Sequence, residues 1–257
     1  MATQSDDVLG TRADKIDLGT LNAPALPEKA EDGRTPTLNG MGCATEWVYG
    51  ISQEFVDFAS RCKRPVLDGG AAYGAASVAA LKGGATVIAN DLCKEQLAYL
   101  VSQVADCMPD ALPRLYIKPG ALPDGFDLPK GSLDAVHLSR VMHFFGPEEV
   151  EKMMKNAHEW LATGGKLFII TMSPWHHAMS CLNLGPEYER RLRAGERFPG
   201  IGDDFGSGSS TAPGKKSHAI DPTLIARLAI ENNFMIEKVM LCEGPENMDY
   251  TGAVLVK

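Results

Sequence analysis

The sequence predicts an α/β fold in which a doubly wound, mostly parallel sheet carries helices on both faces. Short apolar runs typical of buried strands alternate with segments whose apolar residues recur at helical spacing. Gly, Pro and Asn residues separate the two kinds of segment. Repeated strand–helix units of this kind form right-handed crossovers, which place helices on both faces of a parallel sheet.

The predicted elements follow one another from about residue 65. Gly83-Gly84 and Gly164-Gly165 end helices, while Pro147 and Pro222 begin them. The seven predicted strands are 66–67, 85–90, 115–117, 133–138, 166–171, 235–241 and 250–256. The helices between them are 75–82, 94–107, 147–161 and one from Pro222 to a left-handed stop at Asn233.

Two segments depart from this alternation. Residues 1–37 lack periodic apolar positions, so we expect a flexible N-terminal arm, or a poorly packed strap, ahead of a domain at 38–257. That domain opens with a helix near residues 48–59. Residues 172–218 hold a polar helix and a Gly/Ser-rich stretch, and a connection this long predicts a lid-like insertion.

Composition disfavours several classes of function. The chain has 257 residues, 44% of them hydrophobic, which is enough for a sizeable core. Its formal charge of −8 and its lack of a basic run disfavour nucleic-acid binding, which needs a cationic surface. The six scattered cysteines, with no leader, apolar span or metal-ligand spacing, favour a cytoplasmic protein without a metal or membrane partner. The oligomeric state is left open.

The turn after the first strand is rich in small residues. Gly70, Ala72 and Gly74 let the backbone approach a ligand, and Asp91 ends the next strand, where it can accept hydrogen bonds from a ribose diol. A tight strand–helix connection explains the same small residues. Asp68 stands directly before the turn, and its charge disfavours a diphosphate there but favours a cation such as the sulfonium or ammonium of S-adenosylmethionine.

At this point the chain resembles the class I S-adenosylmethionine-dependent methyltransferases. The resemblance implies a Rossmann-like sheet of seven strands whose last strand is antiparallel. It is carried by VLDGGAAYG (66–74), VIANDL (87–92), LDAVHLSRVMHFF (133–145), VEKMMKNAHEWLATGGKLFII (150–170), DPTLIARLAIENNFMIEKV (221–239) and GAVLVK (252–257).

The resemblance also implies the residues that bind the cofactor. Asp68 would neutralise the methionyl ammonium, directly or through water, and Asp91 would bind the ribose. An acid that many members use for adenine is missing, so backbone groups of Ala121, or Asp124 with a shifted loop, would take its place. The remaining implied contacts are the backbone of Gly70, Ala72 and Gly74, Leu92 against adenine, and the backbone of Ser139 and Arg140.

Methyl transfer to a protonated nucleophile gains from a general base. His143 and His176 are the candidate catalytic residues, because each follows a strand at the edge where ligands bind. A histidine bonded to backbone at a helix start is the structural alternative, and it is the stronger one for His143. The candidate substrate or lid residues are Trp47, Tyr49, Trp175 and His177, although packing of the first helix equally explains Trp47 and Tyr49.

We therefore expect methyl transfer from S-adenosylmethionine to oxygen, nitrogen or carboxylate of a small molecule. The segment after the fourth strand reads Ser139-Arg140-Val141-Met142, which lacks the Asn/Asp-Pro-Pro-Tyr/Phe motif of enzymes acting on nucleic-acid amines. Two alternatives stay open: a non-catalytic cofactor-binding or regulatory module, and a protein or RNA methyltransferase.

Overall fold

The computed structural model describes residues 6–21, 23–31, 33–177, 184–201, 217–243 and 249–257. Its main sheet consists of eight strands: β1 (Thr11–Arg12), β4 (Val66–Gly69), β5 (Val87–Asn90), β6 (Leu115–Ile117), β7 (Leu133–Ser139), β8 (Leu161–Met172), β9 (Met235–Cys242) and β10 (Tyr250–Val256). The strand order is β1-β6-β5-β4-β7-β8-β10-β9. A separate hairpin joins β2 (Thr35–Pro36) and β3 (Cys43–Ala44).

The sheet is mostly parallel, as predicted. β6, β5, β4, β7 and β8 run parallel to one another, whereas β1 is antiparallel to β6 and β10 is antiparallel to both β8 and β9. The antiparallel last strand is thereby confirmed. β1 adds an eighth strand that we did not predict, because a two-residue strand has no hydrophobic pattern to detect.

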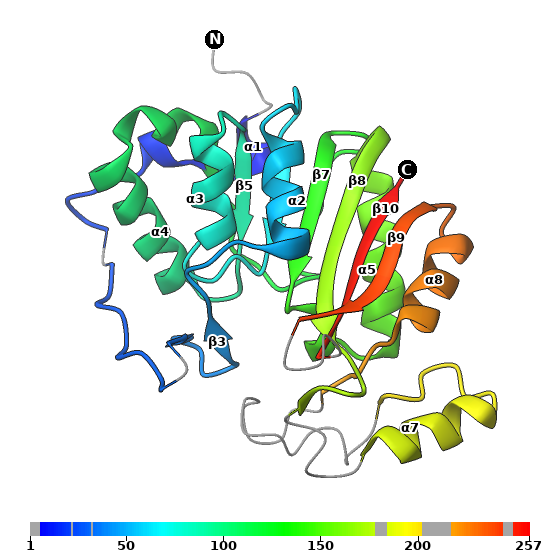
Figure 1. Cartoon of the computed structure of the whole chain (residues 1–257). Coiled ribbons are helices and arrows are strands. Elements are labelled where there is room, and N and C mark those ends of the chain that lie inside the picture. The colour runs from blue at the N-terminus through cyan, green and yellow to red at the C-terminus, as the bar shows by residue number, and fades with distance from the viewer. Residues whose placement is uncertain (1–5, 22, 32, 178–183, 202–216, 244–248) are drawn as a thin grey trace.

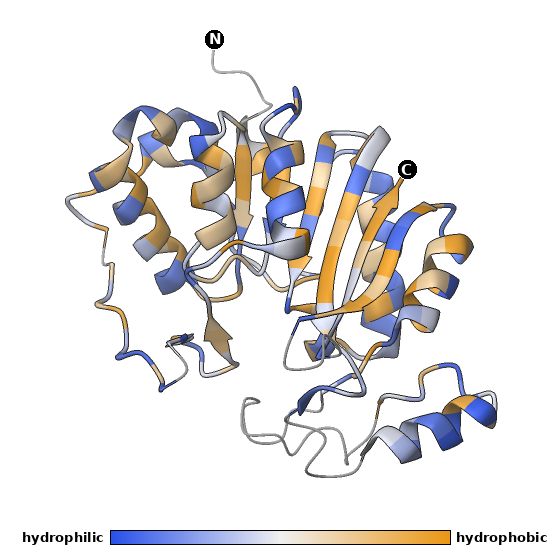
Figure 2. Ribbon diagram, viewed as in Figure 1, coloured by the Kyte–Doolittle hydropathy of each residue, from blue (hydrophilic) through white to orange (hydrophobic). Residues whose placement is uncertain are grey.

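Helices cover both faces of the sheet, and each face has its own core (Figure 1). Alternate residues of one strand point to opposite faces, so Val66 packs toward one set of helices and Leu67 toward the other. α2 (Gly50–Ala59), α3 (Ala75–Lys82) and α4 (Lys94–Cys107) cover one face, and α5 (Pro147–Trp160) and α8 (Pro222–Glu231) cover the other. Figure 2 shows that the central strands are largely hydrophobic.

The local start and stop signals act largely as predicted. The Asp221 carboxylate caps α8 by accepting a hydrogen bond from the Leu224 N–H at 2.7 Å, and Asn233 adopts a left-handed φ of 60° beyond the helix. α5 ends at Trp160, earlier than we expected from Gly164-Gly165. β8 starts directly afterwards, and the Gly164 N–H donates to the Lys257 carbonyl at 2.7 Å, which extends the ladder toward the C-terminal strand.

The N-terminal segment is packed against the sheet where the structure describes it, which differs from the flexible arm that we expected for residues 1–37. α1 (Asp6–Leu9) leads into β1, and a single 3-10 turn, η1 (Ala13–Lys15), follows. Thr11 and Arg12 pair with β6, the Lys118 ammonium donates to the Val8 carbonyl at 2.8 Å, and Ala13 is buried. Backbone pairing at a sheet edge holds this segment without any apolar periodicity.

The insertion after β8 contains the polar helix that the sequence predicts, α7 (Leu184–Arg193), which is mostly hydrophilic in Figure 2. Tyr188 anchors α7 by packing its buried ring edge-on against Trp175, at a centroid distance of 5.8 Å. Residues 178–183 and 202–216, with most of the Gly/Ser-rich stretch, lie outside the described residues. Among the helices of the described ranges, none has the length and apolarity needed to cross a membrane.

Candidate functional site

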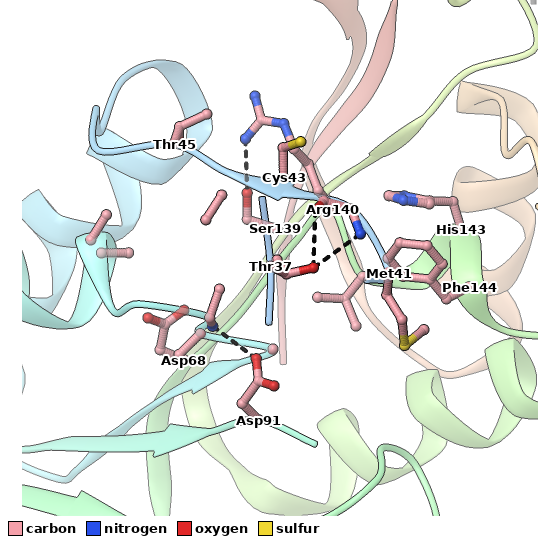
Figure 3. Close-up of a pocket in the computed structure, with 18 of the residues that line it drawn as sticks. Thr37, Met41, Cys43, Thr45, Asp68, Asp91, Ser139, Arg140, His143 and Phe144 are labelled. Atoms are coloured by element: carbon pink, nitrogen blue, oxygen red, sulfur yellow. Dashed lines mark hydrogen bonds between the residues drawn. The ribbon is translucent and has the colours of Figure 1, made fainter. Parts of the chain in front are cut away.

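A pocket of about 460 Å³ lies at the carboxyl edge of the parallel strands, where α/β sheets bind ligands. Its walls come from the turn after β4, the ends of β5 and β7, the segment after β8 and the β2–β3 hairpin. Figure 3 shows Asp68 and Asp91 toward one end and Met41, His143 and Phe144 toward the other, with Ser139 and Arg140 between them.

The small-residue turn after β4 lines the pocket with a backbone in the left-handed region. Gly70, Ala72 and Gly74 have φ angles of 70°, 49° and 82°, a region that favours glycine. A Cβ on Gly70 would lie 2.3 Å from a Val141 methyl, and one on Gly74 would lie 2.4 Å from a Leu100 methyl. The tight connection therefore requires both glycines for packing, and the same conformation brings the turn to the pocket wall.

Asp91 ends β5 and is almost fully buried, with its carboxylate at the pocket. It accepts hydrogen bonds from the backbone N–H groups of Ala72 and Cys93, both at 2.8 Å, and from the Gln96 amide at 3.2 Å. Burial raises the pKa of Asp91, and the backbone hydrogen bonds oppose that shift. The carboxylate is thus fixed against the turn, which suits a pair of hydroxyl donors from a ligand. Leu92 beside it lines the pocket with an exposed side chain.

Asp68 also lines the pocket, yet both of its oxygens already have partners. Oδ1 lies 2.8 Å from Nδ1 of His137, and Oδ2 accepts the Ser77 hydroxyl at 2.7 Å. Nε2 of His137 in turn lies 2.9 Å from the Ser52 hydroxyl. The sequence analysis singled out neither residue for the site, because His137 lies within a strand and Ser52 looks like any polar residue of an amphipathic helix.

The loop after β6 lines the pocket on the side that we assigned to adenine. The Asn90 amide donates to the carbonyls of Lys118 and Gly120, both at 2.9 Å, and so fixes the loop that carries Ala121. Ala121 lines the pocket. Asp124, the alternative, pairs with Lys152 on the exposed surface and does not line the pocket.

Arg140 crosses the middle of the pocket, and its side chain takes a larger part than the backbone role that we expected. The guanidinium pairs with Glu243 and donates to the hydroxyls of Tyr49 at 3.1 Å and Ser139 at 3.2 Å. It also lies over the Tyr250 ring, 4.7 Å from the centroid. Glu243 and Tyr250 were missed because β9 and β10 lie about a hundred positions further along the chain.

The candidate histidines gather at the other end of the pocket, together with Asp249, which the sequence analysis missed. Burial lowers the pKa of His143 to about 3, and Nδ1 of this ring is buried without a hydrogen-bond partner among the described residues. Burial likewise lowers the pKa of His176 to about 4, and its Nε2 lies 3.3 Å from the Tyr250 hydroxyl. Both rings are therefore neutral at pH 7. A neutral ring can accept a proton, and a low pKa makes it a weak base.

His177 and Asp249 form a hydrogen-bonded pair. Nδ1 of His177 lies 2.5 Å from Oδ2 of Asp249, whose Oδ1 accepts the His177 backbone N–H at 2.9 Å. Together with His176 these residues have the donor types of a metal site. However, metal bonds of about 2.0–2.1 Å hold two ligands of one ion about 3 Å apart. The contact between His177 and Asp249 is shorter and is that of a carboxylate orienting an imidazole.

The candidate lid residues divide between the pocket and the insertion. Trp47 and Tyr49 line the pocket with about half of each side chain exposed. Trp175 does not line it, and packs on Tyr188 instead. The β2–β3 hairpin supplies Met41 and Cys43 to the pocket, a contribution that we did not predict because part of this hairpin lies within the expected arm.

Comparisons with known proteins find a methyltransferase domain in part of the chain and solved structures that share its fold. A family model described as a methyltransferase domain matches residues 66–165. Among solved structures, an S-adenosylmethionine-dependent methyltransferase from Mesorhizobium loti is 18% identical, with a TM-score of 0.57 over 81% of this chain and 98% of that one. One from Methanosarcina mazei is 16% identical, with a TM-score of 0.56 over 81% and 96%.

Magnesium protoporphyrin IX methyltransferase from Synechocystis, solved with bound SAH, is 15% identical, with a TM-score of 0.55 over 80% of this chain and 84% of that one. At these identities the structures show a shared fold. A search of curated proteins gives no match.

Proposed function

We propose that the chain is a class I S-adenosylmethionine-dependent methyltransferase, which its methyltransferase-domain match and its fold support, and that its acceptor is a small molecule. The observation that carries this proposal is the single continuous pocket. It extends from the carboxylates beside the β4 turn to a cluster of histidines, and the β2–β3 hairpin contributes to its wall.

The residues at one end of the pocket fit this cofactor. Asp91 offers a fixed carboxylate to the ribose, while Leu92 and Ala121 provide the surfaces for adenine. The buried negative charge of Asp68 behind the turn favours a cation and disfavours a diphosphate. When bound, S-adenosylmethionine supplies an electrophilic methyl group on sulfur, and the protein positions the nucleophile and removes any proton that it carries.

The other end of the pocket fits a small organic acceptor. Met41, Phe144 and Met172 provide apolar walls, and the histidines provide a few polar groups. This mixture and the volume of about 460 Å³ are typical of small-molecule sites, which span about 300–1,000 Å³. Among the structural neighbours, a geranyl diphosphate methyltransferase and the magnesium protoporphyrin IX enzyme are both named for small-molecule substrates.

We assign proton removal to the end that holds His143, His176 and His177, for an acceptor whose nucleophile is a hydroxyl or another protonated group. The His177–Asp249 pair is the arrangement best suited to this task, because a carboxylate that accepts from Nδ1 leaves Nε2 free of its proton. An acceptor with a neutral amine or a carboxylate needs positioning alone.

Calorimetric titration with S-adenosylhomocysteine tests the cofactor part of the proposal. We expect binding by the native chain and a loss of about tenfold or more for Asp91→Asn, because the ribose loses hydrogen bonds to a charged group. Asp124→Asn is the matched control, since Asp124 is an exposed carboxylate outside the pocket lining and should bind as the native chain does. No binding by the native chain at millimolar ligand would contradict the cofactor assignment.

Turnover separates an enzyme from a binding module. We expect release of S-adenosylhomocysteine when the chain is incubated with S-adenosylmethionine and a fractionated small-molecule extract. If release requires the protein or RNA fraction instead, the small-molecule assignment is wrong.

A further inference from the structure

A chain of three buried side chains runs from the sheet to the cofactor end of the pocket. Asp68 lies near the end of β4, His137 lies beside it on β7, and Ser52 faces them from α2. The two contacts measure 2.8 Å from Asp68 to Nδ1 of His137 and 2.9 Å from Nε2 to the Ser52 hydroxyl. All three residues line the pocket, and none is more than 7% exposed.

The direction of these hydrogen bonds follows from the carboxylate. An ionised Asp68 accepts only, so the ring nitrogen beside it donates, and Nδ1 of His137 carries the proton. With this single proton on the ring, Nε2 is an acceptor, and the Ser52 hydroxyl donates to it. The Phe55 ring stacks on His137 at a centroid distance of 4.5 Å and fixes its plane.

This arrangement determines what Ser52 offers to a ligand. Its proton is directed to His137, so the oxygen presents lone pairs to the pocket and prefers a hydrogen-bond donor. The hydrogen bonds from Ser52 to His137 and from His137 to Asp68 both point toward the carboxylate, and aligned hydrogen bonds polarise one another. The Ser52 oxygen therefore binds a cationic hydrogen-bond donor more strongly than a neutral one.

We propose that Ser52 receives the ammonium of the cofactor's methionyl group, and that Asp68 acts on this ammonium through His137 and Ser52. The proposal rests on the cofactor assigned under the proposed function. It replaces the contact, direct or through water, that we expected of Asp68, whose two oxygens are occupied by His137 and Ser77. Ser52 is thus a binding residue for the cofactor, and His137 is a positioning residue.

Two ligands and two variants test the proposal. The ligands are S-adenosylhomocysteine and its deaminated analogue, in which hydrogen replaces the α-amino group. The variants are Ser52→Ala and the matched control Ser77→Ala. Ser77 donates its hydroxyl to the same carboxylate at 2.7 Å and is buried, but it does not line the pocket. Both substitutions place alanine within a helix, where it is well tolerated.

We expect the native chain to bind S-adenosylhomocysteine at least about tenfold more tightly than the deaminated analogue, as a hydrogen bond to a charged group implies. Ser52→Ala should lose this preference by weakening only the amino-bearing ligand. Ser77→Ala should keep the preference, because any change that it causes affects both ligands alike.

A Ser52→Ala variant that keeps the native preference would overturn the proposal. Covalent labelling of Ser52 by a fluorophosphonate would also overturn it, because the carboxylate–imidazole–hydroxyl order would then serve a nucleophile. If the native chain binds neither ligand, the proposed function itself fails. Binding of S-adenosylhomocysteine without any preference over the deaminated analogue leaves the proposed function intact and removes only this inference.

Discussion

At the scale of single residues, Asp249 is the carboxylate whose charge most directly affects the histidine end of the pocket. Asn in its place keeps the shape but cannot stabilise a protonated His177. For an acceptor that loses a proton we expect Asp249→Asn to lower kcat by about a hundredfold and to leave the affinity for S-adenosylhomocysteine unchanged. Steady-state kinetics and calorimetry check the two parts.

The control for this variant is Glu237→Gln. Glu237 also pairs with a basic side chain, Lys166, but it does so on the outer strand, away from the pocket. The Glu237→Gln variant should leave kcat unchanged. If Asp249→Asn has the native kcat with a hydroxyl acceptor, the His177–Asp249 pair takes no part in proton transfer.

The two aspartates beside the β4 turn show how far single residues could be predicted. Asp91 faces the pocket from the end of β5, because the strand's end position alone places it there. Asp68 occupies the equivalent end of β4, but its partners Ser52 and His137 come from a helix and a strand whose relative register no local pattern specifies. The positions of the two aspartates could therefore be predicted from the sequence, whereas the hydrogen-bond partners of Asp68 could not.

At the scale of elements, Gly10 determines whether β1 can join the sheet. Its φ is +111°, and an added Cβ would lie 2.6 Å from the Ile117 carbonyl oxygen. We expect Gly10→Ala to detach residues 6–15, which limited proteolysis with trypsin would report as faster cleavage after Arg12 or Lys15. Affinity for S-adenosylhomocysteine should persist, since β1 lies at the edge beyond β6.

Gly131→Ala provides the control for Gly10→Ala. Gly131 also has a positive φ, of 67°, but an added Cβ there would meet no atom within 4 Å. It should carry only the cost of the left-handed backbone and leave the N-terminal cleavage rate unchanged. Equal cleavage rates in the native chain and Gly10→Ala would show that β1 does not protect this segment.

Elements with chemical start and stop signals were predictable, and short pairings were not. α3 and α4 have the bounds that their glycine and proline neighbours indicate, since capping acts locally. β1 is held by backbone hydrogen bonds to β6, which lies far along the chain, and β2 pairs with β3 in a short hairpin. A two-residue pairing leaves no periodic trace in the sequence, so part of the pocket wall was hidden within an apparent arm.

At the scale of the whole molecule, the pocket requires the complete sheet. The cofactor end depends on β4 and β5, while the histidine end depends on residues after β8 and on Tyr250 of β10. Arg140 joins the two ends by holding Tyr49 and Glu243. The family resemblance could predict the first end because its motifs are contiguous. The second end is assembled from separate segments, and the fold alone brings them together.

Burial of neutral histidines makes the stability of the whole molecule depend on pH. His143 and His218 have pKa values lowered by burial to about 3 and about 4, whereas an unfolded histidine has a pKa of about 6.5. Between these values the unfolded chain binds protons that the folded chain does not. The free energy of unfolding should therefore fall as pH falls from about 6.5 toward 4, by up to about 1.4 kcal/mol per pH unit for each histidine.

Urea unfolding at pH 7, 6 and 5 measures this pH dependence. The variant His218→Gln removes the contribution of one titrating histidine. Gln can still donate to the Phe145 carbonyl, which Nδ1 of His218 approaches at 3.2 Å, but it does not titrate. We expect the variant to lose less stability than the native chain between pH 6 and 5, by about 1 kcal/mol. Parallel pH profiles for the two chains would mean that His218 is protonated equally in the folded and unfolded states, which burial without a charged partner does not permit.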